Sequence, residues 1–147
     1  MANTSAISPA TNLGGGLFSF EVQSTEHSQM LDITASVQNV VTLSEVREGL
    51  CTIFIPHTTA AVTVNECFDA GVKQDLLKEL AKIVPWDDGY VHSGGNSAAH
   101  IRTSLIGPSN TLIVHGGRVL LGSWQSIYFA DFDGIRDRTV YVKITAG

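Results

Sequence analysis

The sequence predicts a single α+β domain with antiparallel, β-sandwich-like sheets and two or three helices. Its 147 residues are enough for one domain with its own hydrophobic core. Short apolar runs separated by Gly or Asp-Gly turns fill the last third of the chain, which is typical of hairpins. Around residues 33–41 and 72–83 the apolar residues recur instead at helical spacing.

The chain begins with a polar segment. Residues 1–16 have neither the basic start nor the apolar stretch of a secretory signal, so we expect a flexible arm before a domain that spans residues 17–147. The alternation of apolar and polar residues in Leu17–Val22 predicts the first strand. Asp32 is the expected cap of a helix whose apolar residues recur as far as Val41.

Two strands and a second helix are predicted in the middle of the chain. Leu50–Ile55 is a β-rich apolar run that ends at Pro56, and Ala61–Glu66 alternates, so we expect these two to be neighbouring strands. An amphipathic helix is expected at residues 69–84, and Pro85 ends it.

Residues 86–96 predict a long irregular loop, and a short helix is expected at Ser97–Ile106. Loops of this length within a compact domain are usually functional. Four further apolar runs with turn residues between them predict an antiparallel sheet made of hairpins. These runs are Thr111–Val114, Arg118–Leu121, Gln125–Phe129 and Thr139–Ile144.

Composition argues against several classes of protein. The net charge is −5, and the nine Lys and Arg residues are scattered, whereas a nucleic-acid partner requires a basic stripe. The chain lacks a run of about 18 apolar residues, which a membrane span needs. Cys51 and Cys67 have no CxxC spacing, so we expect a reducing, cytoplasmic location. A small phosphorylated substrate is compatible with the negative net charge of the chain, because one or two arginines and a cation can neutralise the phosphate locally.

Polar residues follow two of the predicted strands. His57, Thr58 and Thr59 come directly after a strand that ends in proline, where side chains face a cleft, although a single histidine is often structural. Asn65 and Glu66 end the next strand, and they return to the His57 region if the two strands pair. The alternative is an exposed strand end that caps the following helix.

The predicted loop and the helix after it carry a dense set of oxygen and imidazole donors. They are Asp87, Asp88, His92, Asn96 and His100. Such donors suit a divalent cation or a proton relay, but their spacing matches no standard zinc motif. Solvated loop polarity is the alternative interpretation.

The last polar group lies near the C-terminus. Trp124 beside Gln125 can stack on a planar ring and hydrogen-bond its edge, or serve as a core or subunit contact. Arg136 and Arg138 can clamp a phosphate, or pair with neighbouring aspartates such as Asp133.

The order of these motifs resembles the YjbQ-like family. They run Pro56–Ala61, Asn65-Glu66, Tyr90–His92, Asn96 with Ala99-His100, Leu121–Gln125 and Phe132–Arg138. The resemblance covers residues 18–144. Ser123 stands where the family usually has Thr. His115 follows Ile113-Val114, where the family often has a proline-valine pair, so His115 has no family support as a site residue.

The resemblance implies an α+β fold, a homotrimer and an activity named secondary thiamine-phosphate synthase. In that reaction a pyrimidine diphosphate alkylates the nitrogen of a thiazole phosphate. The residues in matching motif positions are His57, Asn65, Glu66, His92, Asn96, His100, Trp124 and Gln125. We further expect Thr58, Thr59 and Arg136 to contact substrate.

Departure of pyrophosphate requires charge neutralisation by Mg²⁺ or another cation and by Arg or N–H donors. Glu66, Asp87 or Asp88 would recruit Mg²⁺, whereas Zn²⁺ fits better if the imidazoles of His57, His92 and His100 converge.

Another function is compatible with the same residues: a trimeric metal- or small-ligand-binding protein with weak or no thiamine-related activity. The chain has no Gly-rich phosphate loop and no paired carboxylate signature, which favours this alternative. A hydrolase that used His57 as base toward Thr58 or Thr59 would lack an evident orienting partner.

Overall fold

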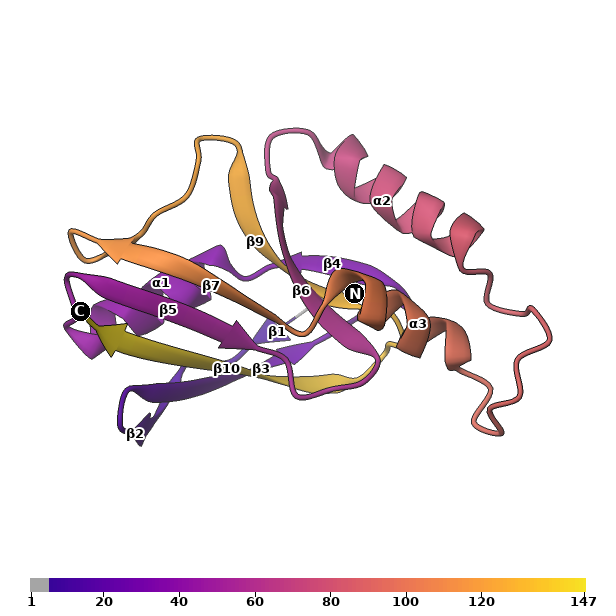
Figure 1. Ribbon diagram of the computed structural model, residues 1–147, viewed down its shortest axis with the longest axis horizontal. Helices are drawn as coiled ribbons and strands as arrows, with labels where there is room; N and C mark the ends of the chain where they lie inside the picture. Colours follow the sequence, from indigo (N-terminus) through magenta and orange to yellow (C-terminus); the bar gives the residue numbers. More distant parts are fainter. Residues whose placement is uncertain (1–5) are drawn as a thin grey trace.

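The computed structural model describes residues 6–147 and confirms the α+β class (Figure 1). Over this range the chain forms two antiparallel sheets and three helices. Within the same range, no helix has the length and apolar character needed to cross a membrane.

The larger sheet joins the two ends of the chain. Its strands are β1 (Ala6–Ile7), β2 (Thr11–Gly14), β3 (Leu17–Gln23), β5 (Gly49–Phe54), β7 (Ser109–His115), β8 (Arg118–Val119) and β10 (Asp137–Ala146). Their order is β1-β3-β10-β5-β7-β8, and β2 also pairs with β3. The C-terminal strand β10 therefore lies between β3 and β5.

The smaller sheet has the order β4-β9-β6, with β4 at Gln29–Asp32, β6 at Ala60–Glu66 and β9 at Gln125–Asp131. Successive side chains of β9 point to opposite faces of this sheet. Ile127 and Phe129 belong to one hydrophobic core, and Tyr128 and Ala130 to another. The small sheet is thus covered on both faces.

The first core fills the space between the two sheets, together with helix α1 (Thr34–Ser44). Val37 and Val40 of α1 pack there with Phe20 of β3. The N-cap residue of α1 is Ile33, one residue after the predicted cap, and the carboxylate of Asp32 accepts the Thr34 N–H at 2.9 Å from just before the helix.

The second core lies on the other face of the small sheet, beneath helices α2 (Ala70–Ile83) and α3 (Ser97–Ile106). Leu80 of α2 and Ala99 of α3 pack there with Ala130 of β9. The Asp69 carboxylate accepts the Gly71 N–H at 2.8 Å and caps α2, which confirms the predicted start of that helix. The connection between α2 and α3 is the predicted irregular loop.

The N-terminal arm is ordered where the structure describes it, and the prediction of flexibility is wrong there. Ala6–Ile7 and Thr11–Gly14 pair with β3. These edge strands carry few apolar residues because most of their side chains are exposed, so their sequence shows no alternation. Residues 1–5 of the predicted arm lie outside the described range.

The strands β5 and β6 do not pair, although the sequence predicts that they are neighbours. β5 pairs with β10 and β7, whereas β6 pairs with β9 in the other sheet. The predicted hairpin sheet of the back half is divided in the same way, because β9 leaves the sheet that contains β7, β8 and β10. Apolar alternation identifies a strand but not its partner. Asn65 and Glu66 lie at the far end of β6 from His57, and a hairpin of β5 and β6 would also have left them there, because its second strand ends away from the turn.

Candidate functional site

A buried ion pair organises one end of the small sheet. Arg138 Nη2 lies 2.8 Å from Asp131 Oδ1, and its Nε donates to Asp131 Oδ2 at 3.0 Å. Asp131 is 0% and Arg138 4% exposed. Arg138 Nη2 also donates to the Thr59 hydroxyl oxygen at 2.9 Å, so the Thr59 O–H is free to donate elsewhere. We call this region, formed by residues 57–59, 92–100 and 131–138, the histidine end.

His57 is held in one protonation state at this end. Its Nε2 accepts the Thr139 N–H at 2.9 Å, which assigns the proton of the neutral ring to Nδ1. Burial lowers the pKa of His57 and the Arg138 charge adds to this effect, while the charge of Asp131 opposes it. His57 is therefore a neutral hydrogen-bond donor, and its Nε2 is unavailable as a base or a metal ligand.

Asn96 and Asp133 extend the polar network toward the loop. Asn96 Nδ2 donates to Asp133 Oδ2 at 2.8 Å, and Arg136 Nη2 lies 3.0 Å from the same oxygen. Arg136 therefore makes the ion pair that the sequence suggested as the alternative to a phosphate clamp. Asn96 Oδ1 is buried without a hydrogen-bond partner. A buried acceptor of this kind suits a bound water, ion or ligand.

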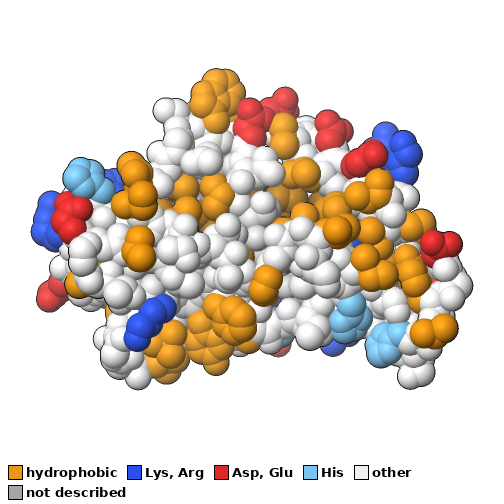
Figure 2. Space-filling view, in the orientation of Figure 1, with side chains coloured by type: hydrophobic (Ala, Val, Ile, Leu, Met, Phe, Trp, Pro, Cys, Tyr) orange, Lys and Arg blue, Asp and Glu red, His pale blue; other side chains and the backbone are white. Residues whose placement is uncertain are grey.

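His92 and His100 lie together beside Asn96. Their ring centroids are 5.3 Å apart in a T-shaped arrangement. A Cβ at Gly94 would lie 2.7 Å from His92 Nε2 and 3.2 Å from Asn96 Oδ1, so a side chain at position 94 would disturb both groups. A hollow of about 400 Å³ is lined by Tyr90, Val91, His92, Ser97, His100 and Ile101. In Figure 2, histidine side chains gather at the end of the molecule where Figure 1 shows α3 and the preceding loop.

One copy of the chain does not supply a complete metal site. Among residues 6–147, no three His, Cys, Asp or Glu side chains lie close enough to hold a common ion. Asp87 and Asp88 line a separate hollow with His92, and both aspartates are exposed. The remaining donors are His92, His100 and the Asn96 oxygen, fewer than the four ligands that zinc usually takes.

The other predicted residues lie at the opposite end of the small sheet. Glu66 is paired in register with Gln125, and the Cys67 N–H donates to the Trp124 carbonyl at 3.0 Å. The rings of Phe68 and Trp124 are 5.0 Å apart, and their side chains are 69% and 61% exposed. We call this region, formed by residues 65–68 and 122–125, the tryptophan end.

Gln125 has a local role at the tryptophan end. Its Oε1 accepts the Gly122 N–H at 2.8 Å and thereby closes the turn before β9. Only the NH₂ group of Gln125 is then left to contact the edge of a ring. Asn65 likewise uses its Oδ1 locally, to accept the Glu66 N–H at 2.9 Å.

The two ends are separated by the length of β6. Ala60 is paired with Asp131 at the histidine end and Glu66 with Gln125 at the tryptophan end. Six steps of about 3.3 Å put these ends about 20 Å apart. In Figure 1 the loop at residues 120–124 lies at the top of the view, before β9, and the loop at residues 85–96 lies at the right-hand end, before α3.

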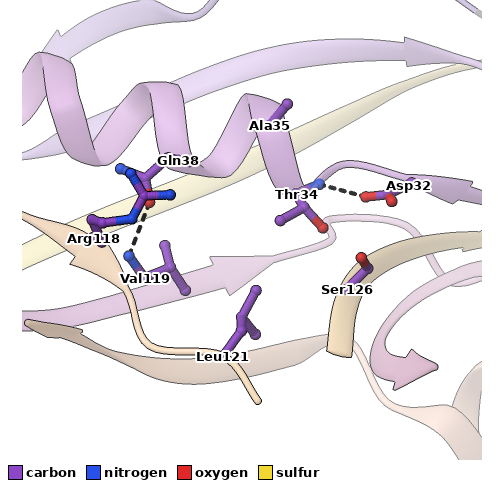
Figure 3. A pocket seen from close by; sticks show the side chains of 8 residues that line it. All are labelled: Asp32, Thr34, Ala35, Gln38, Arg118, Val119, Leu121 and Ser126. Carbon is purple, nitrogen blue, oxygen red and sulfur yellow. Dashed lines mark hydrogen bonds between the residues drawn. The ribbon is translucent and has the colours of Figure 1, made fainter. Parts of the chain in front are cut away.

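Another hollow adjoins the tryptophan end, and sequence reasoning missed it. It encloses about 630 Å³ between α1, β8 and the start of β9 (Figure 3). Its lining residues are Asp32, Thr34, Ala35, Gln38, Arg118, Val119, Leu121 and Ser126. Gln38 accepts the Val119 N–H at 3.0 Å and donates to the Gly117 carbonyl at 3.1 Å. No motif indicates this hollow, because its lining combines two stretches that are far apart in the sequence, residues 32–38 and 118–126.

The sequence matches one family model and several related proteins. The model described as UPF0047 protein YjbQ-like matches residues 18–147. The chain belongs to this family. It is 42% identical over 128 residues to UPF0047 protein MJ1081 of Methanocaldococcus jannaschii, covering 87% of this chain and 93% of that protein. It is 40% identical over 129 residues to UPF0047 protein YugU of Bacillus subtilis, covering 87% and 98%.

Solved YjbQ-like structures have the same architecture. A YjbQ/UPF0047 family protein from Clostridium acetobutylicum matches with a TM-score of 0.85 and 44% identity, over 86% of this chain and 98% of that one. A protein from Sulfolobus solfataricus, described as of unknown function, matches with a TM-score of 0.86 and 25% identity, over 98% and 100%. Membership in the YjbQ-like family therefore supports the fold, and none of these relatives identifies a reaction.

His115, which has no family support, lies outside both ends. Its Nδ1 is 3.0 Å from Glu48 Oε2, and both side chains are exposed at the turn between β7 and β8. His115 therefore serves as a control residue for the YjbQ-like histidines.

The lowered pKa of His57 predicts a pH dependence of stability. The unfolded chain binds a proton near the ordinary pKa of 6.5, and the folded chain binds it only at lower pH. The stability due to neutral His57 is thus fully present above pH 6.5 and is lost as the pH falls toward the folded pKa. Urea unfolding at a series of pH values should give a shallower acid slope for His57→Gln than for wild type. A His115→Gln control should keep the wild-type slope, and equal slopes for wild type and His57→Gln would contradict the assignment.

Proposed function

We propose that this YjbQ-like chain is a transferase of the secondary thiamine-phosphate synthase type. It would join a pyrimidine diphosphate to a thiazole phosphate, release pyrophosphate, and act as a cytoplasmic homotrimer. The observation that carries this proposal is the set of fixed hydrogen-bond donors around the buried Asp131–Arg138 pair.

These donors suit the oxygens of a diphosphate. His57 presents an Nδ1–H and Thr59 an O–H, and each is oriented by a hydrogen bond on its other side. Arg136 adds a partly exposed guanidinium that Asp133 holds in place. Donors fixed before the reaction stabilise charge that develops on a leaving group without having to reorganise.

The proton requirements of the reaction match the state of His57. The thiazole nitrogen attacks a carbon of the pyrimidine substrate with its own lone pair, so a C–N bond forms. The C–O bond to the diphosphate breaks, and its electron pair leaves with pyrophosphate. The attacking nitrogen carries no proton, so the step requires no general base. His57, whose Nε2 is already occupied, is suited to donate a hydrogen bond to the leaving group.

A divalent cation would strengthen this site. His92, His100 and the unpartnered Asn96 oxygen are the groups at the histidine end that would hold it. When bound, the cation would neutralise charge on the diphosphate oxygens.

The adjacent pair His92 and His100 also favours a second candidate function, that of a trimeric metal- or small-ligand-binding protein. Two imidazoles beside a free amide oxygen suit a transition metal whether or not a reaction follows. The two functions differ in whether product forms from the precursors.

The variant Glu66→Gln separates these functions, because it keeps the shape of the side chain and removes one negative charge. Glu66 lies about 20 Å from the histidine end of its own copy, so it can act there only on a neighbouring copy of the homotrimer. If it helps in this way to hold a cation that neutralises pyrophosphate, the rate should fall more than the affinity for either precursor. Loss of one such contact typically raises the barrier by about 2.7–4 kcal/mol. The assay is thiamine phosphate formation from the two purified precursors with Mg²⁺, beside a calorimetric titration of each precursor.

Glu48→Gln is the matched control, since Glu48 is an exposed carboxylate that pairs with His115, and its rate should equal that of wild type. If wild type binds neither precursor and forms no product, the transferase proposal is wrong and the binding function replaces it.

A further inference from the structure

We infer that the functional site is composite, with the histidine end of one copy facing the tryptophan end of a second copy. This inference rests on the proposed function in treating the residues at both ends as one site. The structural prediction itself, a contact between unlike ends of two copies, can be tested without any reaction.

The two ends of one copy are too far apart to form one site. The anion donors and imidazoles lie at the histidine end, and the exposed aromatic side chains Phe68 and Trp124 lie at the tryptophan end. About 20 Å of β6 separates the two groups in one copy, by the rise of an extended strand. Hydrogen bonds and ring stacking act over only about 3–7 Å. The two ends of one copy therefore cannot contact the same reacting group.

The histidine end of one copy is incomplete. It holds two adjacent imidazoles and a buried Asn96 oxygen without a partner, and the described residues provide no third His, Cys, Asp or Glu in reach. The tryptophan end carries the carboxylate of Glu66, which has no ion-pair partner among residues 6–147. Glu66 of a second copy would supply the anionic ligand that the imidazoles lack.

Both ends also expose apolar side chains. Val91 is 100% exposed at the rim of the histidine hollow, and Ile101 and Ile135 are also exposed nearby. Phe68 and Trp124 form an exposed aromatic pair at the other end. Aromatic anchors that meet an apolar hollow with a polar rim are typical of the centre of a protein interface.

Contact between two different surfaces of the same chain is heterologous, and it forms a closed ring when the rotation closes. A trimer of this kind would contain three equivalent sites, each made from two copies. The structure thus gives a reason for the trimer that the family resemblance implies: a monomer would hold only half of the site at each end.

A cysteine crosslink tests this contact directly. Cys67 is exposed beside Glu66 at the tryptophan end, whereas Cys51 is buried and its pKa is raised to about 12, so it is unreactive. Val91→Cys places a second thiol at the histidine end. A short bis-maleimide reagent cannot span the distance of about 20 Å within one copy. It should join copies of Val91→Cys into covalent dimers and trimers on a denaturing gel, with position 91 linked to Cys67 by mass spectrometry.

Two controls accompany this test. Val91→Cys/Cys67→Ser should lose the crosslink, and Leu43→Cys, an exposed position on α1, should give only the background of wild type. The inference is overturned if Val91→Cys crosslinks no better than Leu43→Cys, or if light scattering finds a monomer.

The result also separates this inference from the proposed function. A crosslink between 91 and 67 in a protein that forms no thiamine phosphate would overturn only the transferase. Product formation without the crosslink would overturn only the composite site.

Mixed oligomers give a second measurement. When His100→Ala and Trp124→Ala are reassembled together, about a quarter of the interfaces in a random ring pair two intact ends. Activity or metal binding should recover to that extent. A mixture of His100→Ala with His92→Ala should show no recovery, because both substitutions damage the same end. Recovery in neither mixture, or in both, would contradict the composite site.

Discussion

Replacing Asp131 with Ala is expected to lower the free energy of unfolding by about 3–5 kcal/mol, the usual effect of removing one member of a buried ion pair. Asp131 is fully buried and receives two hydrogen bonds from Arg138 and one from the Asp133 N–H. Its removal leaves the Arg138 charge uncompensated in a low-dielectric environment. Urea unfolding followed by circular dichroism measures the effect.

Arg136→Ala is the matched control, because it removes the more exposed of the two aspartate–arginine pairs at the same end. Such pairs contribute about 0–1 kcal/mol. A loss below about 1 kcal/mol for Asp131→Ala would contradict the role given to the buried pair.

The double variant Asp131→Leu/Arg138→Met tests whether the buried ion pair contributes to stability alone or also to function. Apolar replacement of both partners is often neutral or stabilising, so we expect most of the lost stability to return. Thr59 would nevertheless lose its donor, and His57 its charged neighbour. Substrate turnover should therefore stay low in a stable protein. A double variant that regained both stability and turnover would show that the ion pair is structural only.

The sequence predicts most helices and strands well because their signals are local. Ser97–Ile106 is helical over the predicted range, and the helix predicted at residues 69–84 is α2, with Asp69 as its cap. β4 and the N-terminal strands β1 and β2 are missed because they are short edge strands without apolar alternation. Such strands form through their partners and not through their own composition.

The candidate site is harder to predict, because it depends on how the strands are placed in space. The sequence predicts that Glu66 returns to His57 if β5 and β6 pair, and this prediction is wrong for a geometric reason. His57 precedes β6 and Glu66 ends it, so the full length of the strand separates them whichever strand β6 pairs with. The grouping of His92, Asn96 and His100 is predicted correctly in outline, since one loop and the helix that follows it hold all three. The orientation of the His57 ring could not be predicted, because it is set by a hydrogen bond from Thr139, which lies 82 residues further along the chain.

His92→Ala and His100→Ala are each expected to lower the rate of thiamine phosphate formation by about 10²–10⁴-fold, the range typical of a lost catalytic histidine. The two imidazoles are adjacent, and the unpartnered Asn96 oxygen belongs to the same loop and helix, so under the proposed function they would serve one ion or one transition state. Groups that act as a unit are strongly non-additive, and the double variant should be no slower than either single variant. Metal content per chain, measured by elemental analysis, should fall in parallel with activity.

The fold should survive these substitutions. His92 is exposed and His100 only partly buried, so the unfolding midpoint is expected to stay close to that of wild type. His57→Ala should also reduce turnover, but with less effect on metal content, since its Nε2 is engaged by Thr139 and its Nδ1–H is a donor. His115→Ala is the control and should leave turnover, metal content and stability unchanged, because its ring contacts only the exposed Glu48 carboxylate. If His92→Ala and His100→Ala both keep wild-type turnover and metal stoichiometry, the two imidazoles do not belong to the site, and the donors around Arg138 must act without them.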